Sequence, residues 1–241
     1  MKAITFIAIT LLAGAIAGTI LGAINQVVVE PYVDHAIELE MRNTAQSGQV
    51  INPAEFAAYR FWQKGGEIIA GTILGLSIGS LYGIVFAYTR GSISGTNNKK
   101  KALIVASIMW FVLFLMPALK YPPNPPAVGN PETIYYRQSL YVAFLAISGF
   151  SALGLTFLYR KMASSNTKKA IIPSAYAAIM AGAYLAMPAN PDPINAPIDL
   201  VIGFRITSAI TISVFWALLG MIFGTFWDKL NPDETARISV R

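Results

Sequence analysis

Apolar and polar residues alternate in long blocks along this chain, and the apolar blocks predict membrane-spanning helices. Six segments are strongly apolar: Ala3 to Val29, about Gly66 to Tyr88, Ala102 to about Leu119, about Tyr135 to Leu158, Ala170 to Met187 and about Leu200 to Trp227. At 1.5 Å per residue, about 20 apolar residues in a helix cross the roughly 30 Å hydrocarbon layer of a bilayer. We therefore expect an all-α integral membrane protein with about six transmembrane helices.

The polar blocks between these segments suggest how the spans pair. Six spans leave no room for a separate soluble domain, so we expect one transmembrane domain over residues 1–241. Its helical hairpins are expected at about 1–90, 102–160 and 170–228, followed by a cytoplasmic tail at 229–241. The second helix of each hairpin carries an aromatic–arginine pair, namely Tyr59-Arg60, Tyr136-Arg137 and Phe204-Arg205. We interpret this similarity as a parallel internal repeat.

Glycines recur every four residues in the first two apolar segments. They are Gly14, Gly18 and Gly22 in the first, and Gly71, Gly75, Gly79 and Gly83 in the second. This spacing puts each set on one helix face, where the missing side chains allow another helix to approach closely. We predict that both sets are helix-packing ridges. A signal peptide after Lys2 is the alternative for the first segment, although its apolar run far exceeds the usual 7–15 residues.

Composition narrows the class of function. The chain is 55% hydrophobic and 12% charged, against about 25% charged residues in soluble domains. It has no cysteine, which excludes disulfides and thiolate sites, and its one histidine, His35, excludes a His-rich site built from this chain alone. We find no HExxH or P-loop motif, so we expect no enzyme and an energy source in a gradient or a partner.

The distribution of positive charge predicts the orientation. Twelve of the eighteen lysines and arginines lie on the side that holds both termini, together with three of the twelve acids. Lysine and arginine are concentrated in cytoplasmic segments of membrane proteins. We expect a multi-pass protein of the cell membrane with both termini cytoplasmic. The net charge of +6 thus reflects topology, and we expect the chain to partner the lipid bilayer rather than nucleic acid.

Two proline-rich stretches lie on the predicted outer side, at Met116 to Gln138 and at Pro188 to Pro197. Proline fixes φ, lacks an N–H and disfavours helix at the preceding residue. We expect no helix to run through the first stretch, which should form a stiff, extended connector.

The first outer segment contains a candidate metal site. Glu30, Asp34 and Glu38 follow an i, i+4, i+8 spacing that places them on one helix face, beside His35. Carboxylates with one imidazole suit a divalent first-row cation. A solvated acidic face on a surface helix is the alternative. Met116 and Met187 are either soft ligands or packing residues.

Arginines stand near the outer ends of three spans, at Arg60, Arg137 and Arg205. A charge at this depth is costly and tends to be paired, whereas near the interface it can snorkel. They are either a gate or loop-anchoring ring, or interfacial anchors. We expect pairs with Glu67, Glu132 and Asp199.

The run Lys120-Tyr-Pro-Pro-Asn-Pro-Pro-Ala-Val-Gly-Asn-Pro-Glu-Thr-Ile134, followed by Arg137-Gln138, resembles the signature of the CbtA family of cobalt transporter subunits. Asn195-Ala-Pro197 with Phe204-Arg205 is similar to that family's last hairpin. The resemblance implies an outer-loop and helix-start motif formed by Lys120, Asn124, Pro125, Pro126, Glu132, Arg137, Gln138, Asn195, Pro197 and Arg205, with Arg60 at the equivalent place in the first hairpin. Family members are generally described with five spans, and many have outer-loop histidines that this chain lacks.

The resemblance implies cobalt(2+) or a similar divalent cation as a transported substrate, linked to cobalamin synthesis, with no permanently bound cofactor. It also implies a small single-span, histidine-bearing partner such as CbtB; a homo-oligomer is the other possible assembly. The alternative function is a non-catalytic accessory or structural subunit of a larger membrane complex.

Overall fold

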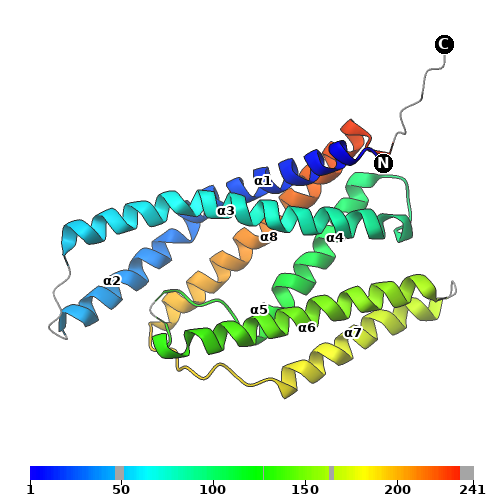
Figure 1. The fold of residues 1–241 in the computed structure, drawn as a ribbon. Helices are drawn as coiled ribbons and strands as arrows, with labels where there is room; N and C mark the ends of the chain where they lie inside the picture. Colours follow the sequence, from blue (N-terminus) through cyan, green and yellow to red (C-terminus); the bar gives the residue numbers. More distant parts are fainter. Residues whose placement is uncertain (47–51, 127, 163–165, 234–241) are drawn as a thin grey trace, which may run out of the picture. The chain divides into compact units, whose positions relative to one another are not determined.

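The computed structural model describes residues 1–46, 52–126, 128–162 and 166–233, and over these ranges the chain forms helices and no strand (Figure 1). The α-helices are α1 (Ala3–Val28), α2 (Glu30–Gln46), α3 (Pro53–Thr89), α4 (Asn98–Trp110), α5 (Met116–Lys120), α6 (Ile134–Lys161), α7 (Asn166–Ala186) and α8 (Ile198–Leu230). Shorter elements are the 3-10 helix η1 (Arg90–Ser92), the π-helical segment η2 (Phe111–Leu115) and the 3-10 helix η3 (Pro131–Thr133). The expected all-α class is confirmed for these residues.

The chain divides into two compact units. Unit 1 comprises Met1–Ile108 and Ile202–Arg241, and unit 2 comprises Met109–Val201. Helices α1, α2 and α3 lie wholly in unit 1, and α5, α6 and α7 lie wholly in unit 2. The expected single transmembrane domain stays a prediction.

Five helical segments are long and apolar enough to cross a membrane, at Ala3–Val28, Pro53–Ser92, Asn98–Lys120, Pro131–Lys161 and Ile198–Leu230. They correspond to five of the six predicted spans. In α7 the apolar part is the shorter segment Ala170–Ala186, at the lower limit of about 17–25 residues for a spanning helix. The sixth span, the three hairpins and the internal repeat stay predictions.

Helix α3 is longer than the span that the sequence predicts. It begins at Pro53, in the favourable first-turn position for proline, and the Asn52 side chain accepts a hydrogen bond from the Ala54 N–H (3.1 Å). Its 37 residues extend about 55 Å at 1.5 Å per residue, well beyond the hydrocarbon layer. Hydropathy marks the membrane-spanning part near Gly66, whereas the Asn52 cap and the start of the helix lie further upstream.

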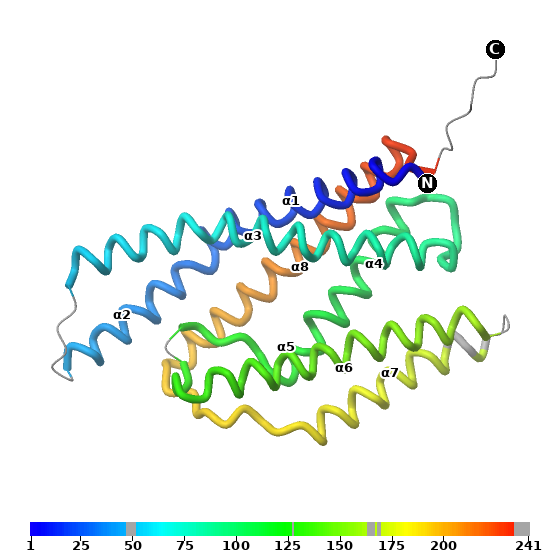
Figure 2. The backbone as a smooth tube through the Cα atoms, in the orientation of Figure 1, coloured from blue at the N-terminus to red at the C-terminus, as the bar shows by residue number. Residues whose placement is uncertain are grey.

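The glycines of α1 and α3 face each other where the two helices pack, and we call this contact the glycine seam. Helices α1 and α3 run side by side (Figure 2). A Cβ on Gly14 would lie 2.3 Å from the Gly75 carbonyl oxygen, and a Cβ on Gly18 would lie 2.8 Å from the Gly75 Cα. Such distances are shorter than any side chain tolerates, so glycine is required on both helices. Where Gly83 ends the seam, the Thr10 side chain fills the space on α1.

Aromatic side chains form a core in unit 1 beyond the glycine seam. Phe86 of α3 lies edge-on to Phe223 and Trp227 of α8, with ring centroids 5.0 Å apart in both pairs. The Tyr82 hydroxyl donates to the Ala102 carbonyl at 2.6 Å, which ties α3 to α4. These contacts join three helices at the end of unit 1 opposite α2.

The core of unit 2 contains Tyr121, Leu140, Phe144 and Met180. Helices α6 and α7 pack along each other in this unit. Met116 and Met187 are partly buried and pack against this core, in agreement with the packing interpretation of both methionines.

The first proline-rich stretch differs from the sequence prediction. Helix continues past Pro117 to Lys120, the non-helical chain begins at Tyr121, and α6 starts at Ile134. The expectation that no helix runs through 116–138 is confirmed, because residues 121–126 and 128–130 are not helical, but the connector is shorter than expected at both ends. The π-helical segment before Pro117 accommodates its missing N–H, and the prolines that follow stop the helix.

Candidate functional site

The acidic residues of the first outer segment continue the glycine seam between α1 and α3. Gln26 on α1 and Glu30 and Asp34 on α2 keep the four-residue spacing of the α1 glycines. The Gln26 side-chain amide donates to the Lys64 carbonyl of α3. Because α3 runs antiparallel to α1, each step outward along α1 and α2 meets a residue nearer the start of α3.

A four-residue ionic cluster closes the seam on this side. Arg60 of α3 forms ion pairs with Glu30 and with Asp34, the latter at 2.6 Å, and Lys64 lies 2.7 Å from Asp34. The Arg60 and Glu30 side chains are each 11% exposed, whereas those of Asp34 and Lys64 are 47% and 42% exposed. Two carboxylates thus face two cations, with the inner pair buried and the outer pair half exposed.

The Asp34 carboxyl is held in its charged form by this cluster. Burial opposes the charge, but hydrogen bonds and positive charge from Lys64 and Arg60 outweigh it, so the pKa of Asp34 lies below its ordinary value of 3.8. At neutral pH the carboxylate is ionised and already has two cationic partners.

The other two residues of the candidate metal site, His35 and Glu38, are not members of this four-residue cluster. His35 and Glu38 are exposed, and Glu38 forms an exposed ion pair with Arg42 at 2.8 Å. Across residues 1–46, 52–126, 128–162 and 166–233, no three histidine, aspartate or glutamate side chains are grouped so as to hold a metal ion. Binding of a cation by Glu30, Asp34, His35 and Glu38 stays a prediction.

Arg60 does not form the ion pair expected with Glu67. Its acidic partners are Glu30 and Asp34, because α2 lies closer to its guanidinium group than the next turns of its own helix do. The Glu67 Oε2 and Asn25 Oδ1 atoms are buried and have no hydrogen-bond partner in the described part of the chain.

Arg137, at the start of α6, ties the two proline-rich loops of unit 2 together. Its Nε lies 3.0 Å from the Asp192 carboxylate, and its other nitrogens donate to the Val128 and Asn130 carbonyls at 3.3 and 3.1 Å. Asp192 Oδ2 also accepts from the Asn130 N–H (2.8 Å) and the Thr133 hydroxyl (2.6 Å). We refer to Arg137, Asp192, Asn130 and Thr133 as the loop clamp.

The expected pair of Arg137 with Glu132 is not formed. The Asn130 side chain accepts from the Glu132 N–H and starts the 3-10 helix η3, and the Glu132 side chain is exposed. Gly129 has a φ of +101°, and a Cβ there would lie 2.7 Å from both the Arg137 guanidinium and the Asp192 carboxylate. The loop clamp therefore requires glycine at this position.

Lys120 joins the start of the first proline-rich loop to α7. Its ammonium donates to the Tyr184 carbonyl at 2.7 Å and lies 4.5 Å from the Tyr184 ring centroid. The neighbouring Tyr121 hydroxyl donates to the Pro188 carbonyl at 2.6 Å. Of the other motif residues, Pro125 is buried and Asn124 half-buried, whereas Pro126, Gln138, Asn195 and Pro197 are exposed.

Arg205 lies in the second turn of α8 and is partly buried. Two residues earlier, Gly203 packs against the Tyr32 ring of α2, where an added Cβ would approach the ring within 2.3 Å. The expected pair of Arg205 with Asp199 stays a prediction.

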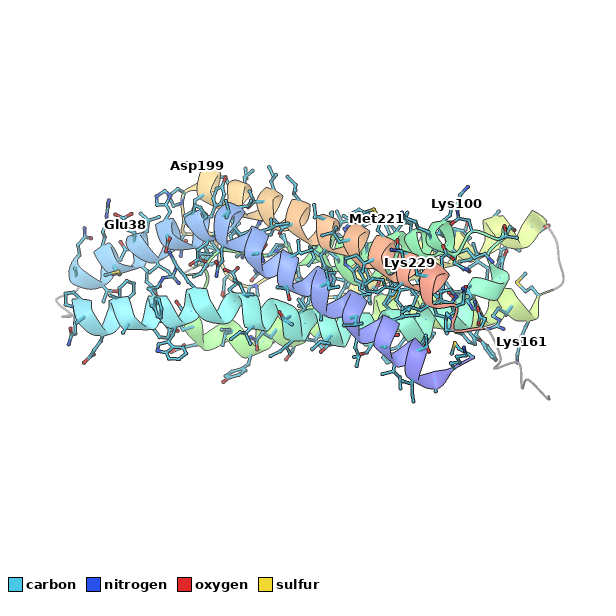
Figure 3. The ribbon with its side chains drawn as sticks, turned by 90° about the horizontal axis from the view of Figure 1, so that it is seen from above. Glu38, Lys100, Lys161, Asp199, Met221 and Lys229 are labelled. Atoms are coloured by element: carbon cyan, nitrogen blue, oxygen red, sulfur yellow. The ribbon has the colours of Figure 1, made fainter. Side chains whose placement is uncertain are left out.

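Charge is segregated along unit 1. Figure 3 shows Glu38 on α2 at one end, and Lys100 on α4 and Lys229 on α8 at the opposite end. At this basic end, Arg90 forms a bidentate ion pair with Asp233 and lies over the Trp227 ring. Apolar helices that separate an acidic and a basic end define a multi-pass integral membrane protein.

The family comparison agrees with this class. Residues 3–228 match the family described as "Probable cobalt transporter subunit (CbtA)". The chain therefore belongs to the CbtA family, a family of membrane transport proteins for cobalt uptake. No curated protein and no solved structure matches it.

Sequence reasoning missed several residues that shape these sites. Gln26 and Lys64 were detectable, because Gln26 continues the four-residue spacing of Gly14, Gly18 and Gly22. Asp192 carried a weaker signal, as one acid in a proline-rich loop. The contact of Ser148 with Val112 had no sequence signal, because it depends on the meeting of α6 with the π-helical segment.

Proposed function

We propose that this chain is the membrane-embedded subunit of an uptake system for a divalent metal cation, cobalt(2+), that supplies cobalamin synthesis. The observation that carries the proposal is the family match over residues 3–228, which includes all five candidate spans except the last two residues of the last one. The charged ends of unit 1 support it, since a cation would first meet the acidic one.

We further propose that both termini are cytoplasmic and that α2 and the loop clamp face outward. Support comes from the basic residues, which collect in segments on the side of the termini. The acidic end of unit 1 with Glu38 is then outside, and the end with Lys100 and Lys229 is cytoplasmic.

The outer acidic residues divide into two roles in this proposal. Glu30 is held by Arg60 in the buried ion pair and closes the seam. Asp34, His35 and Glu38 are exposed and form the capture surface, where a hydrated divalent cation competes with Lys64 for Asp34. A divalent charge is favoured in this exchange because it interacts twice as strongly with each carboxylate as Lys64 does.

Passage through the membrane needs ligands beyond those of this chain in the proposal. A bare cation that enters an apolar bundle loses its hydration with little to replace it. A small single-span, histidine-bearing partner of the CbtB type would supply nitrogen ligands at that step, and a homo-oligomer would supply a pore between chains. The family description as a subunit supports a partner.

Uptake of labelled cobalt by cobalt-starved cells tests the proposal, with this chain alone and with a candidate single-span partner. His35→Ala with Glu38→Gln removes two of the three residues of the capture surface and leaves the ion pairs of Asp34 with α3 in place. We expect the half-saturating cobalt concentration to rise about tenfold in that variant, as expected when a weak ligand set is lost. Glu40→Gln with Glu55→Gln removes two exposed acids elsewhere and serves as the matched control.

The accessory-subunit function is the second candidate, and the absence of a grouped metal-ligand set in the described residues favours it. It predicts that the partner alone supports cobalt uptake, and that this chain changes only the partner's stability. The accessory-subunit function is excluded if cobalt uptake requires this chain and if His35→Ala with Glu38→Gln, the capture variant, shifts the half-saturating cobalt concentration. An unchanged half-saturation in the capture variant contradicts the capture surface.

A further inference from the structure

A backbone carbonyl in unit 2 lacks its normal helical partner. The Met116 N–H donates to the Phe111 carbonyl five residues back, which defines the π-helical turn. The Val112 carbonyl would then need the N–H of residue 117, which is a proline and has none. Val112 therefore has no amide donor at either the α or the π spacing.

The Ser148 hydroxyl of α6 supplies the missing donor. Its Oγ lies 2.6 Å from the Val112 carbonyl oxygen, and the whole residue is 0% exposed. The Tyr176 hydroxyl of α7 lies 2.7 Å from the same Oγ. Because Ser148 has one proton and gives it to Val112, Tyr176 is the donor in the second bond. A chain of two hydrogen bonds thus joins the π-helical segment to α6 and α7.

A second observation next to this segment points to another conformation. The Trp110 indole N–H, directly before the π-helical turn, is buried and has no hydrogen-bond partner among the described residues. Buried donors are normally satisfied, so this conformation leaves a favourable interaction unmade. A small change in the turn at 111–115 would reorient this ring.

We propose that residues 111–117 form a hinge, and that Ser148 with Tyr176 is the latch that holds it in the conformation seen here. When the latch opens, α5 moves and carries Lys120 and Tyr121, which hold the first proline-rich loop against α7 and Pro188. The latch thereby controls the position of the loop clamp. This inference goes beyond the proposed function and does not depend on which cation is moved.

Hydrogen–deuterium exchange of the full chain in detergent micelles tests the latch. In Ser148→Ala we expect amide exchange over residues 112–121 to accelerate on the order of tenfold, as expected when one buried hydrogen bond is lost. Tyr176→Phe keeps the ring and the Ser148–Val112 bond, and a smaller acceleration is expected. The controls are Ser139→Ala, an exposed serine on α6, and Tyr184→Phe, which keeps its ring under Lys120.

A rescue variant separates a hinge from a general loss of stability. Pro117→Ala restores the N–H that Val112 lacks, so in Ser148→Ala with Pro117→Ala we expect exchange to return to the wild-type rate. Persistence of the fast exchange in this double variant, or wild-type exchange in Ser148→Ala alone, overturns the proposal. Exchange that rises equally in α1 and α3 indicates global destabilisation and overturns it as well.

The chain's lack of cysteine allows a direct measurement of the movement. Spin labels on Leu119→Cys in α5 and Leu153→Cys in α6 occupy exposed positions, 59% and 53% accessible. We expect one distance population in the wild-type background, a second one with Ser148→Ala, and one again with Pro117→Ala added. A single unchanged population in all three backgrounds contradicts the hinge.

Discussion

Arg137 and Asp192 form an ion pair of 3.0 Å between the start of α6 and the loop that precedes α8. The Asp192 side chain is 7% exposed, although it lies in a loop of prolines and small residues. The pair fixes two proline-rich loops to each other, and with the backbone carbonyls of Val128 and Asn130 it engages all three nitrogens of the planar guanidinium. Lysine has neither the shape nor the number of donors to replace it.

The loop clamp predicts a loss of stability in acid. The Thr133 hydroxyl lowers the pKa of Asp192 below its ordinary 3.8; burial opposes this, and the Asn130 amide and the Arg137 charge add to it. A depressed carboxyl pKa contributes stability that is fully present above the unfolded pKa and is lost as the pH falls through the folded one. We expect the melting temperature of wild-type protein to fall as the pH drops below about 4, and Asp192→Asn to weaken this fall.

Thermal melting of the two proteins in detergent across this pH range measures the effect. Glu132→Gln is the matched control, since Glu132 is a neighbouring exposed acid outside the clamp. Parallel acid profiles for wild type and Asp192→Asn would show that Asp192 contributes no such stability.

The glycine seam predicts a strong position dependence of alanine substitution. In Gly75→Ala the new Cβ would lie 2.2 Å from the Gly14 carbonyl oxygen, and overpacking of this kind costs about 1–3 kcal/mol. Gly154→Ala in α6 has no atom within 4 Å, so we expect it to be neutral or stabilising by up to about 1 kcal/mol, since alanine favours helix. Equilibrium unfolding in mixed micelles compares them, and equal stabilities would contradict the close packing of α1 on α3.

The buried pair of Arg60 with Glu30 predicts non-additive effects. Arg60→Met leaves the buried Glu30 carboxylate with Lys64 at 3.8 Å as its nearest cation, and loss of one partner of a buried pair costs about 3–5 kcal/mol. We expect Arg60→Met with Glu30→Gln to be more stable than Arg60→Met alone. Arg42→Met, at the exposed pair with Glu38, should cost at most about 1 kcal/mol. If the effects of Arg60→Met and Glu30→Gln on the free energy of unfolding are additive, then Arg60 is an interfacial anchor and its pair with Glu30 does not contribute to stability.

Single-cysteine labelling tests the predicted topology, because the chain has no cysteine of its own. With a membrane-impermeant maleimide, we expect Glu40→Cys, Glu132→Cys and Asn195→Cys to react in intact cells. Asn97→Cys and Lys161→Cys should react only after permeabilisation. Lys161 and Asn195 lie on either side of α7, so labelling of both from the same side would show that α7 does not cross and would reverse the place of the C-terminus.

The sequence by itself determined the local features of this protein. Hydropathy located five candidate spans, and glycine spacing identified the close-packed faces of α1 and α3, because both signals repeat with the period of a single helix. It also identified the motif that places the chain in the CbtA family. The sequence did not predict the π-helical turn before Pro117, since such a turn has no distinct local pattern.

Only the tertiary structure decided which charged and polar groups meet. Arg60 pairs with Glu30 and not with Glu67, and Arg137 pairs with Asp192 and not with Glu132. The Ser148 hydroxyl donates a hydrogen bond to the Val112 carbonyl. These partners lie far apart in the sequence, and their pairing depends on the register between packed helices and on the paths of the loops. A local spacing cannot encode that register, whereas a buried charge or carbonyl must find a partner once the helices are packed.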